Sequence, residues 1–255
     1  MHPLADRLRA ALTAGRSVTL SAGDVPLFTY SYGAAQPELR DLRTLDGAAL
    51  PSAVTWTPPH AAPGAATHVA ITDLSSSDDS ATVAHHLRWP AFDEWRSLTA
   101  SLSGAGAWTL LFENTVTNVS GRRLLLDGRS LAMPTLAAPA AAPTAWHAAH
   151  GDDFTLVAVD DAANLQHPPR WSAGLSPAPF GATGVVVGVD RTIAFRYALV
   201  IAPPGPPPDA LAGLGLNALA GPSVARPHRC HGDHSRATPT RKARGRALTR
   251  RRDTH

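Results

Sequence analysis

The stretch WTLLFENTVTNVSGRRLLL, residues 108–126, decides the fold class of this 255-residue chain. Its side chains alternate in character, as they do in a strand whose neighbouring residues point to opposite faces. One face would carry Thr109, Leu111, Glu113, Thr115 and Thr117, and the other mainly Leu110, Phe112, Val116 and Val119. Ser120 and Gly121 suit a tight connection, because glycine tolerates positive φ. We therefore predict a hairpin of residues 108–119 and 122–126, with one face in a core and the other open to solvent or ligand.

The same period-two pattern recurs along most of the chain. We expect further strands at residues 17–21, 25–32, 69–72, 82–89, 96–102, 154–159, 183–189 and 192–201. Helical periodicity is weak after residue 16, apart from a short amphipathic segment at residues 209–219. Many short strands separated by turn residues predict an all-β protein, an antiparallel β-sandwich.

The domain organisation follows from changes in composition. Residues 1–16 have Leu4, Leu8 and Leu12 at helical spacing, which indicates a short helix or a frayed leader. Residues 17–220 form the predicted sandwich domain, with loops at 57–66, 132–149 and the proline-rich 203–208. Beyond Ala220 the apolar content collapses, so we expect residues 221–255 to be a disordered tail.

Charge and cysteine content exclude several functions. Residues 225–255 hold ten of the 23 Lys and Arg residues but two of the 20 Asp and Glu residues, so this segment carries +8 and the remainder −5. The basic character therefore belongs to the tail, and we do not expect nucleic acid as a partner of the domain. One cysteine excludes a disulfide framework. The tail sequence HRCHGDH, residues 228–234, has metal-like spacing without apolar support, so no metal or cofactor is expected. No apolar run is long enough for a membrane helix.

Two places in the strands could carry catalysis. His85 and His86 are adjacent in a strand, so only one of them can face a cleft as a general acid or base. In the alternative, one is packed or capped and the other faces solvent. Glu113 is a carboxylate inside a strand, where it could act as a base or pair with an arginine.

The densest group of polar residues follows the strand at 154–159. Asp160 and Asp161 could perturb each other's pKa, or they could cap a turn. Asn164, His167, Arg170 and Trp171 follow, and they offer an amide, an imidazole, a guanidinium and an indole. Sugars need directional polar groups and an apolar plate, so this segment predicts a carbohydrate site, with Asp160 catalytic and the other four residues binding substrate. In the alternative, Trp171 is a core anchor and the polar residues stiffen a loop.

Several segments, in order, resemble the bacterial PmoA-like family, often labelled "methane oxygenase PmoA". They are TLSAGDVPLFTYSYG and QPELRDLRTLDGAAL near the N-terminus, WTLLFENTVTNVSGR in the centre, and LVAVDDAANLQHPPRW and TIAFRYALVIA towards the end. The resemblance covers roughly residues 17–201. It implies a mutarotase-like β-sandwich (a supersandwich) and a link to carbohydrate metabolism.

The chain departs from the family at two motifs. The family's His-rich motif is replaced by SAVTWTPPHAAPGAATHVAI, residues 52–71, which keeps His60 and His68. The family's Gly-Tyr-Gly-Gly segment is replaced by LDGRSLAMPTLAAPAAAPTAW, residues 126–146. We therefore expect a shortened, cytoplasmic relative that acts on or binds a small carbohydrate. A non-catalytic structural or binding relative is the alternative, and non-specific nucleic-acid binding by the arginine tail is less favoured.

Overall fold

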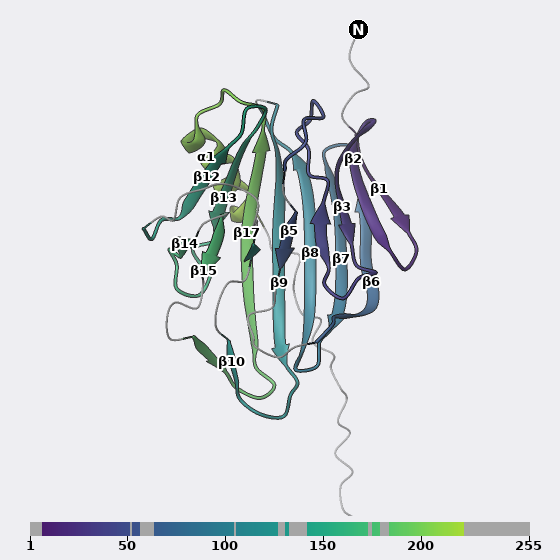
Figure 1. Ribbon diagram of the computed structural model, residues 1–255, viewed down its shortest axis with the longest axis vertical. Helices are drawn as coiled ribbons and strands as arrows, with labels where there is room; N and C mark the ends of the chain where they lie inside the picture. The colour runs from purple at the N-terminus through teal and green to yellow at the C-terminus, as the bar shows by residue number, and fades with distance from the viewer. Residues whose placement is uncertain are drawn as a thin grey trace, which may run out of the picture.

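The computed structural model describes residues 7–51, 53–56, 64–104, 106–126, 131–132, 142–172, 175–178 and 184–221. Within these residues the chain forms 17 strands and one helix, and the two principal sheets pack face to face (Figure 1). The predicted antiparallel β-sandwich is therefore confirmed. None of the helical structure in the described part of the chain is long and apolar enough to cross a membrane.

The larger sheet has seven strands in the described residues, all antiparallel. In spatial order they are β12 (Trp146–His150), β13 (Thr155–Asp160), β17 (Thr192–Ala202), β9 (Trp108–Asn118), β8 (Phe92–Leu102), β7 (Ser80–Arg88) and β6 (Thr67–Ser76). The stretch quoted first thus supplies the central strand of the sheet.

The smaller sheet packs over the inner face of the larger one. Its order is β1 (Leu8–Thr13), β2 (Ser17–Ala22), β3 (Val25–Ser31), β4 (Glu38–Arg40), β5 (Val54–Trp56) and β11 (Leu131–Ala132). Two short ribbons complete the described fold: β10 (Leu124–Leu126) with β16 (Val185–Val187), and β14 (Arg170–Ser172) with β15 (Ser176–Ala178).

The main core lies between the two sheets. Trp108 and Phe112 on β9 are 0% and 2% exposed, and the Trp108 ring stacks on Phe28 of β3 with centroids 5.9 Å apart. The buried indole N–H of Trp108 donates to the carbonyl of Arg43 at 2.8 Å. These contacts explain why the alternate, apolar residues of β9 face inwards.

A second core lies on the outer face of the larger sheet, under α1 (Pro208–Ala220). Alternate residues of β13 and β17, such as Val159 and Val200, pack against Leu211 and Ala212 of the helix. Gly215 lets the helix approach closely, since a Cβ at this position would lie 2.6 Å from the side chain of Val159. The expected helix at residues 209–219 is confirmed, and it follows a proline run that ends β17.

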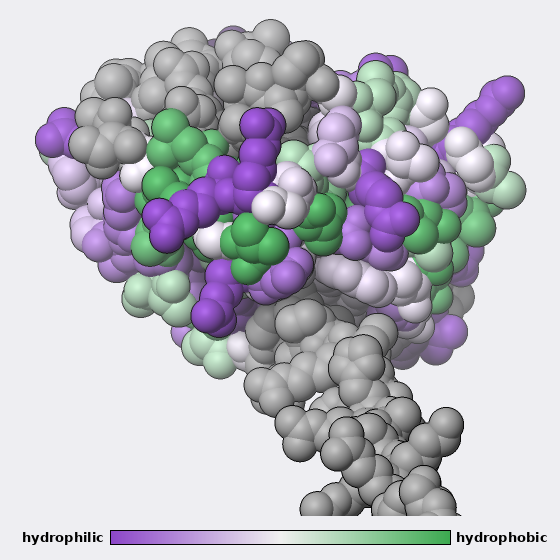
Figure 2. All heavy atoms as spheres, turned by 90° about the horizontal axis from the view of Figure 1, so that it is seen from below, coloured by the Kyte–Doolittle hydropathy of each residue, from purple (hydrophilic) through white to green (hydrophobic). Residues whose placement is uncertain are grey.

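The lower end of the sandwich mixes apolar and charged surface. Exposed apolar side chains from the chain around β10 and β16 include Val119, Leu125, Val186 and Val189. Figure 2, which views the molecule from below, shows hydrophobic and strongly hydrophilic residues side by side on this face.

Three expectations about local structure were wrong. The predicted hairpin partner, β10, pairs with β16, and β9 pairs with β8 and β17. The chain does bend at Ser120 and Gly121, with a positive φ at Gly121. However, the Asn118 amide contacts the carbonyls of Arg122, Val187 and Gly188, and this directs the chain towards β16.

The other two corrections concern edge strands. Residues 8–13, expected to be helical or frayed, form strand β1, which pairs with β2 in register from Leu8 to Thr13. The loop expected at residues 132–149 contains β12, which pairs with β13. The expected tail, residues 221–255, lies outside the described residues except for Gly221.

Candidate functional site

The four residues predicted to be catalytic lie in separate places. His85 points inwards from β7 and is 0% exposed, whereas His86 lies on the opposite face of the same strand. Glu113 lies on the outer face of β9, and Asp160 ends β13. Three strands separate β7 from β13, so these strands are about 19 Å apart at normal strand spacing. One pocket therefore does not contain all four side chains.

Asp160 and His167 form the pair whose geometry best fits acid–base catalysis. The Asp160 carboxylate is 1% exposed, and its Oδ2 lies 2.6 Å from Nδ1 of His167, whose side chain is 25% exposed. A buried carboxylate that holds Nδ1–H leaves Nε2 of the ring to accept or donate a proton. Within the described residues, no hydrogen bond to this Nε2 is formed. The Nδ1 atom of His167 is therefore engaged by the carboxylate, on a side chain that is partly exposed.

Asn164 holds the carboxylate in place. Its Nδ2 donates to Asp160 Oδ1 at 2.7 Å and to the carbonyl of Arg196 at 2.6 Å, while its Oδ1 accepts from the backbone N–H of Arg196 at 2.8 Å. The loop after β13 is thus tied to β17. Burial raises the pKa of the Asp160 carboxyl, and the hydrogen bonds from Asn164 and His167 oppose this effect.

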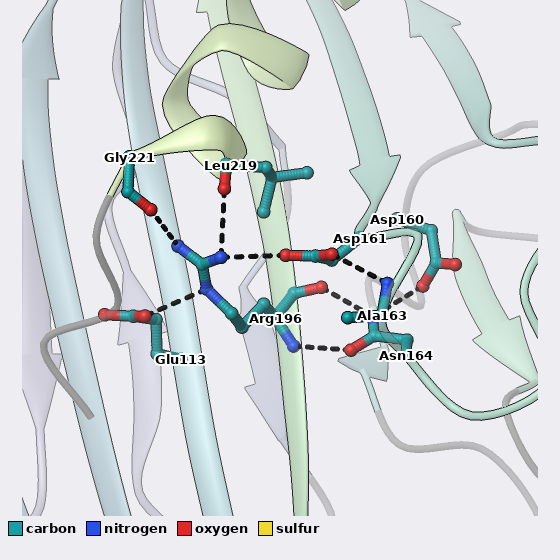
Figure 3. Close-up of polar contacts among 8 residues, drawn as sticks. All are labelled: Glu113, Asp160, Asp161, Ala163, Asn164, Arg196, Leu219 and Gly221. Atoms are coloured by element: carbon teal, nitrogen blue, oxygen red, sulfur yellow. Dashed lines mark hydrogen bonds and ion pairs between the residues drawn. The ribbon is translucent and has the colours of Figure 1, made fainter. Parts of the chain in front are cut away.

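Arg196 occupies the centre of a neighbouring network, drawn in Figure 3. Its Nε donates to Glu113 Oε1 at 2.9 Å, and its Nη1 donates to Asp161 Oδ2 at 2.9 Å and to the carbonyl of Leu219 at 2.9 Å. Its Nη2 donates to the carbonyl of Gly221 at 3.3 Å. We call this group the Arg196 clamp. Glu113 is fully buried in it as a counter-charge.

The clamp also completes helix α1. The last turn of α1 contains no basic residue, and its carbonyls would otherwise lack a positive group nearby. Arg196 supplies that group from β17, a strand far from α1's last turn in sequence. Sequence analysis missed it, although an arginine within the apolar run TIAFRYALVIA was an available signal.

The remaining predicted binding residues lie apart from the pair. Trp171 is 2% exposed, and its indole N–H donates to the carbonyl of Thr144 at 2.8 Å, so protein covers the faces of the ring. Arg170 is exposed on the ribbon strand β14. Of the residues expected to bind substrate, Asn164 and His167 are thus the two that contact Asp160.

His85 belongs to a different chain of hydrogen bonds on the inner face. Its Nδ1 lies 2.8 Å from the Tyr30 hydroxyl, and its Nε2 lies 2.8 Å from Nδ1 of His68, an exposed residue of β6. Burial, with the positive charge of Arg96, lowers the pKa of His85 to about 3, so the ring is neutral. Burial also raises the pKa of Tyr30, which keeps its proton.

A buried ion pair lies beside this chain. Glu94 accepts from Arg96 Nε at 2.7 Å, from the Trp89 indole at 2.7 Å and from Asn114 Nδ2 at 2.6 Å. Sequence analysis missed the pair, although Glu94 and Arg96 alternate with the outward-facing residues of β8 and share the face of Leu98.

His86 occupies the outer face, where its ring stacks on Trp95 with centroids 4.4 Å apart. Burial lowers the pKa of His86, and Asp93 nearby opposes the effect. In the part of the chain that the structure describes, no group of three or more His, Cys, Asp or Glu residues is placed to hold a metal ion. The HRCHGDH segment lies outside that part.

Sequence and structure comparisons with known proteins do not identify a family for this chain. No protein-family model matches the chain, and no curated protein matches it. A solved structure described as a "putative aldose 1-epimerase" from Escherichia coli K12 aligns with 76% of this chain and 98% of its own, at 12% identity and a TM-score of 0.36. A TM-score this low carries no argument about this chain.

Proposed function

We propose that the protein binds a small carbohydrate and that His167, backed by Asp160, transfers protons on it. The observation that supports this proposal is the 2.6 Å contact between a buried carboxylate and a partly exposed imidazole. Imidazole is the side chain best suited to exchange protons near neutral pH, and a carboxylate on one nitrogen fixes which nitrogen faces the substrate.

Carbohydrate is the proposed ligand because of the chemistry around the pair. His167 Nε2 can accept a proton from a sugar hydroxyl or return it, whereas Asp160 stays behind the ring and orients it. The amide of Asn164, fixed by the backbone of β17, keeps the carboxylate from turning away. In this proposal Asp160 and Asn164 are positioning residues, and His167 is the catalytic residue.

The proposal includes membership of the PmoA-like family. Support comes from LVAVDDAANLQHPPRW, one of the segments that carry the resemblance, because it brings Asp160, Asn164 and His167 together. Support also comes from the antiparallel sandwich, which is the architecture that the resemblance implies. Because the family's His-rich motif is lost, the segment LVAVDDAANLQHPPRW is where we place the proposed proton transfer.

A non-catalytic role is the second candidate. It is favoured by the burial of Trp171, which removes the apolar plate that a sugar ring would use, and by the bonds with which Asn164 closes its loop. In that case Asp160 and His167 would stabilise the end of β13 and perform no chemistry.

The test combines binding and turnover. Monosaccharides would be titrated by calorimetry, and interconversion of their anomers would be followed by polarimetry. In that reaction a base takes the proton of the anomeric hydroxyl as the bond from C1 to the ring oxygen breaks, the ring oxygen gains a proton, and closure onto the other face of C1 reverses these transfers. We expect His167→Asn to lower the rate by about 10²–10⁴-fold, as loss of a general acid–base does, with a smaller effect on sugar affinity. Asp160→Asn should lower the rate with little change in sugar affinity, because the imidazole loses the carboxylate that orients it.

His150→Gln is the matched control, since His150 is exposed and its Nδ1 lies 3.3 Å from the Thr155 hydroxyl, away from the pair. It should retain the wild-type rate. Wild-type protein that neither binds any sugar at millimolar concentration nor speeds anomer interconversion would overturn the proposal and leave the structural role.

A further inference from the structure

A hollow of about 280 Å³ opens on the outer face of the larger sheet, beside α1. We propose that it binds one uncharged sugar ring, through a site separate from the Asp160–His167 pair. The residues that line it are Thr99, Ser101, Ser103, Thr109, Leu111, Leu214, Asn217 and Ala218.

The sheet supplies the floor of the hollow. Thr99, Ser101 and Ser103 are alternate residues along and just beyond β8, so their hydroxyls point to the same side. Ser101 is paired with Thr109, and Thr99 with Leu111, which brings β9 residues next to them. Four hydroxyl groups and one apolar side chain therefore lie on adjacent strands.

The helix supplies the wall. Leu214, Asn217 and Ala218 are three and four positions apart, which places them on one face of α1. The wall thus adds an amide, which both donates and accepts, to the hydroxyls of the floor. Leu214 and Leu111 give two apolar surfaces for the C–H groups of a ring.

The hydroxyls retain hydrogen-bonding capacity for a ligand. The Ser103 and Thr109 hydroxyls lie 2.8 Å apart, and the Thr99 hydroxyl lies 3.0 Å from that of Thr82. Each hydroxyl has one proton and two lone pairs, so one bond within such a pair leaves capacity over. The pairing also fixes the orientation of these groups before a ligand arrives.

The charge of the lining determines the ligand class. None of the eight lining residues is ionisable. A phosphate, carboxylate or amine placed here would lose hydration without gaining a counter-charge, which is costly. The volume corresponds to about nine water molecules at liquid density, enough for one ring. An uncharged polyhydroxylated ring satisfies the hydroxyls, the amide and the two leucines together.

The Arg196 clamp fixes the end of the helix that forms the wall. It binds the carbonyls of Leu219 and Gly221, one and three positions after the lining residue Ala218, while Gly215 lets the helix pack closely on β13. Figure 3 shows that the guanidinium reaches the end of α1 from the sheet below it. A wall that is already fixed lowers the ordering cost of binding.

The experiment maps binding by amide NMR spectra of the full chain. The probes are neutral monosaccharides, the corresponding sugar 6-phosphates and a disaccharide that ends in the same ring. We expect neutral sugars to shift the signals of Ser101, Thr109 and Asn217, and the phosphates to bind at least tenfold more weakly. A disaccharide that binds more tightly than the monosaccharide would identify the end of a longer glycan as the ligand, and equal binding would identify the free sugar.

Variants make the test specific. Asn217→Ala should weaken binding about tenfold, and Ser101→Trp, which fills the hollow, should abolish it. Leu216→Ala is the matched control, because Leu216 is the exposed neighbour of Asn217 and lies outside the lining. If Ser101→Trp fails to fold, the comparison of Asn217→Ala with Leu216→Ala still shows whether the sugar binds in the hollow.

Two results would overturn the site: no neutral sugar shifts these signals, or Asn217→Ala binds as the control does. The outcome is distinguishable from that of the proposed catalytic pair, since the Asp160 side chain is on the opposite face of the sheet. Sugars that shift the signals of Asn164 and His167 alone would support the pair and refute the hollow. His167→Asn should leave binding in the hollow unchanged.

Discussion

Arg196 shows how one side chain can serve several elements. It neutralises Glu113, which is fully buried, and it also bonds to Asp161 and to the end of α1. Its own side chain is 19% exposed, so solvent screens part of its charge. Arg196 therefore stabilises the fold mainly because it supplies a counter-charge and hydrogen bonds to groups that would otherwise be buried without a partner.

We expect Arg196→Leu to lower the free energy of unfolding by about 3–5 kcal/mol, because removal of one partner leaves a buried charge unpaired. Urea unfolding followed by circular dichroism measures this. The double variant Glu113→Gln with Arg196→Leu should recover part of the loss, since it removes the stranded charge as well. A single variant as stable as the wild type would contradict the role of the clamp.

The pH dependence of stability should report His85. Its folded-state pKa is about 3, below the ordinary value of 6.5, so the unfolded chain binds a proton that the folded chain does not. The contribution of His85 to the free energy of unfolding is therefore fully present above pH 6.5. It is lost as the pH falls towards 3, by about 1.4 kcal/mol per pH unit. Between pH 6.5 and 5, His85→Gln should have a shallower slope than the wild type in urea titrations. The control Leu125→Ala, which changes an exposed and non-ionisable side chain, should keep the wild-type slope, and equal slopes in all three proteins would refute the assignment.

At the level of elements, β9 organises the sandwich, because it is central in the larger sheet and carries Trp108 and Phe112 into the core. Truncation of either side chain to alanine should cost about 3–5 kcal/mol in chemical denaturation. Leu125→Ala provides the comparison, since Leu125 is 46% exposed and such changes usually cost less than about 0.5 kcal/mol. A small effect at both core positions would contradict the packing.

Sequence patterns predicted long strands better than pairings. β7, β8, β9 and β17 have nine or more residues each, so their alternation is statistically clear, whereas β4, β5 and β11 have three or fewer. The β10–β16 pairing joins segments about 60 residues apart, and no local signal specifies it. The expectation of a short helix or a frayed leader at β1 was wrong, because leucines at every fourth position also fit a half-exposed edge strand.

The same distinction applies to the site. Asp160, Asn164 and His167 lie within eight positions of one another, so their proximity was predictable from a single loop. The contacts of Arg196 with Glu113 and of His85 with Tyr30 and His68 join separate strands. Their formation depends on sheet order and register, which alternation along one strand does not encode.

At the scale of the whole molecule, we expect removal of residues 222–255 to have little effect on the melting temperature, because the described residues already form the core. That segment is rich in Arg, His and Thr and poor in large apolar residues, so its composition cannot add a core. Truncation after Gly221 keeps the carbonyl that Arg196 binds. Calorimetry should show a melting temperature within about 2–4 °C of the full chain, equivalent to about 1 kcal/mol at this size. A larger fall would mean that the segment contributes to folding.

The buried Glu94 cluster has a consequence for how this molecule can evolve. Glu94 accepts hydrogen bonds from Arg96, Trp89 and Asn114. A chain that replaced all of these side chains with apolar ones of similar volume would lose little stability, yet any single replacement strands a charge or a polar group in the core. The intact polar cluster and its fully apolar replacement are therefore separated by single variants of lower stability. Descendants of this protein should keep the cluster intact or exchange its members together, whatever ligand the surface comes to bind.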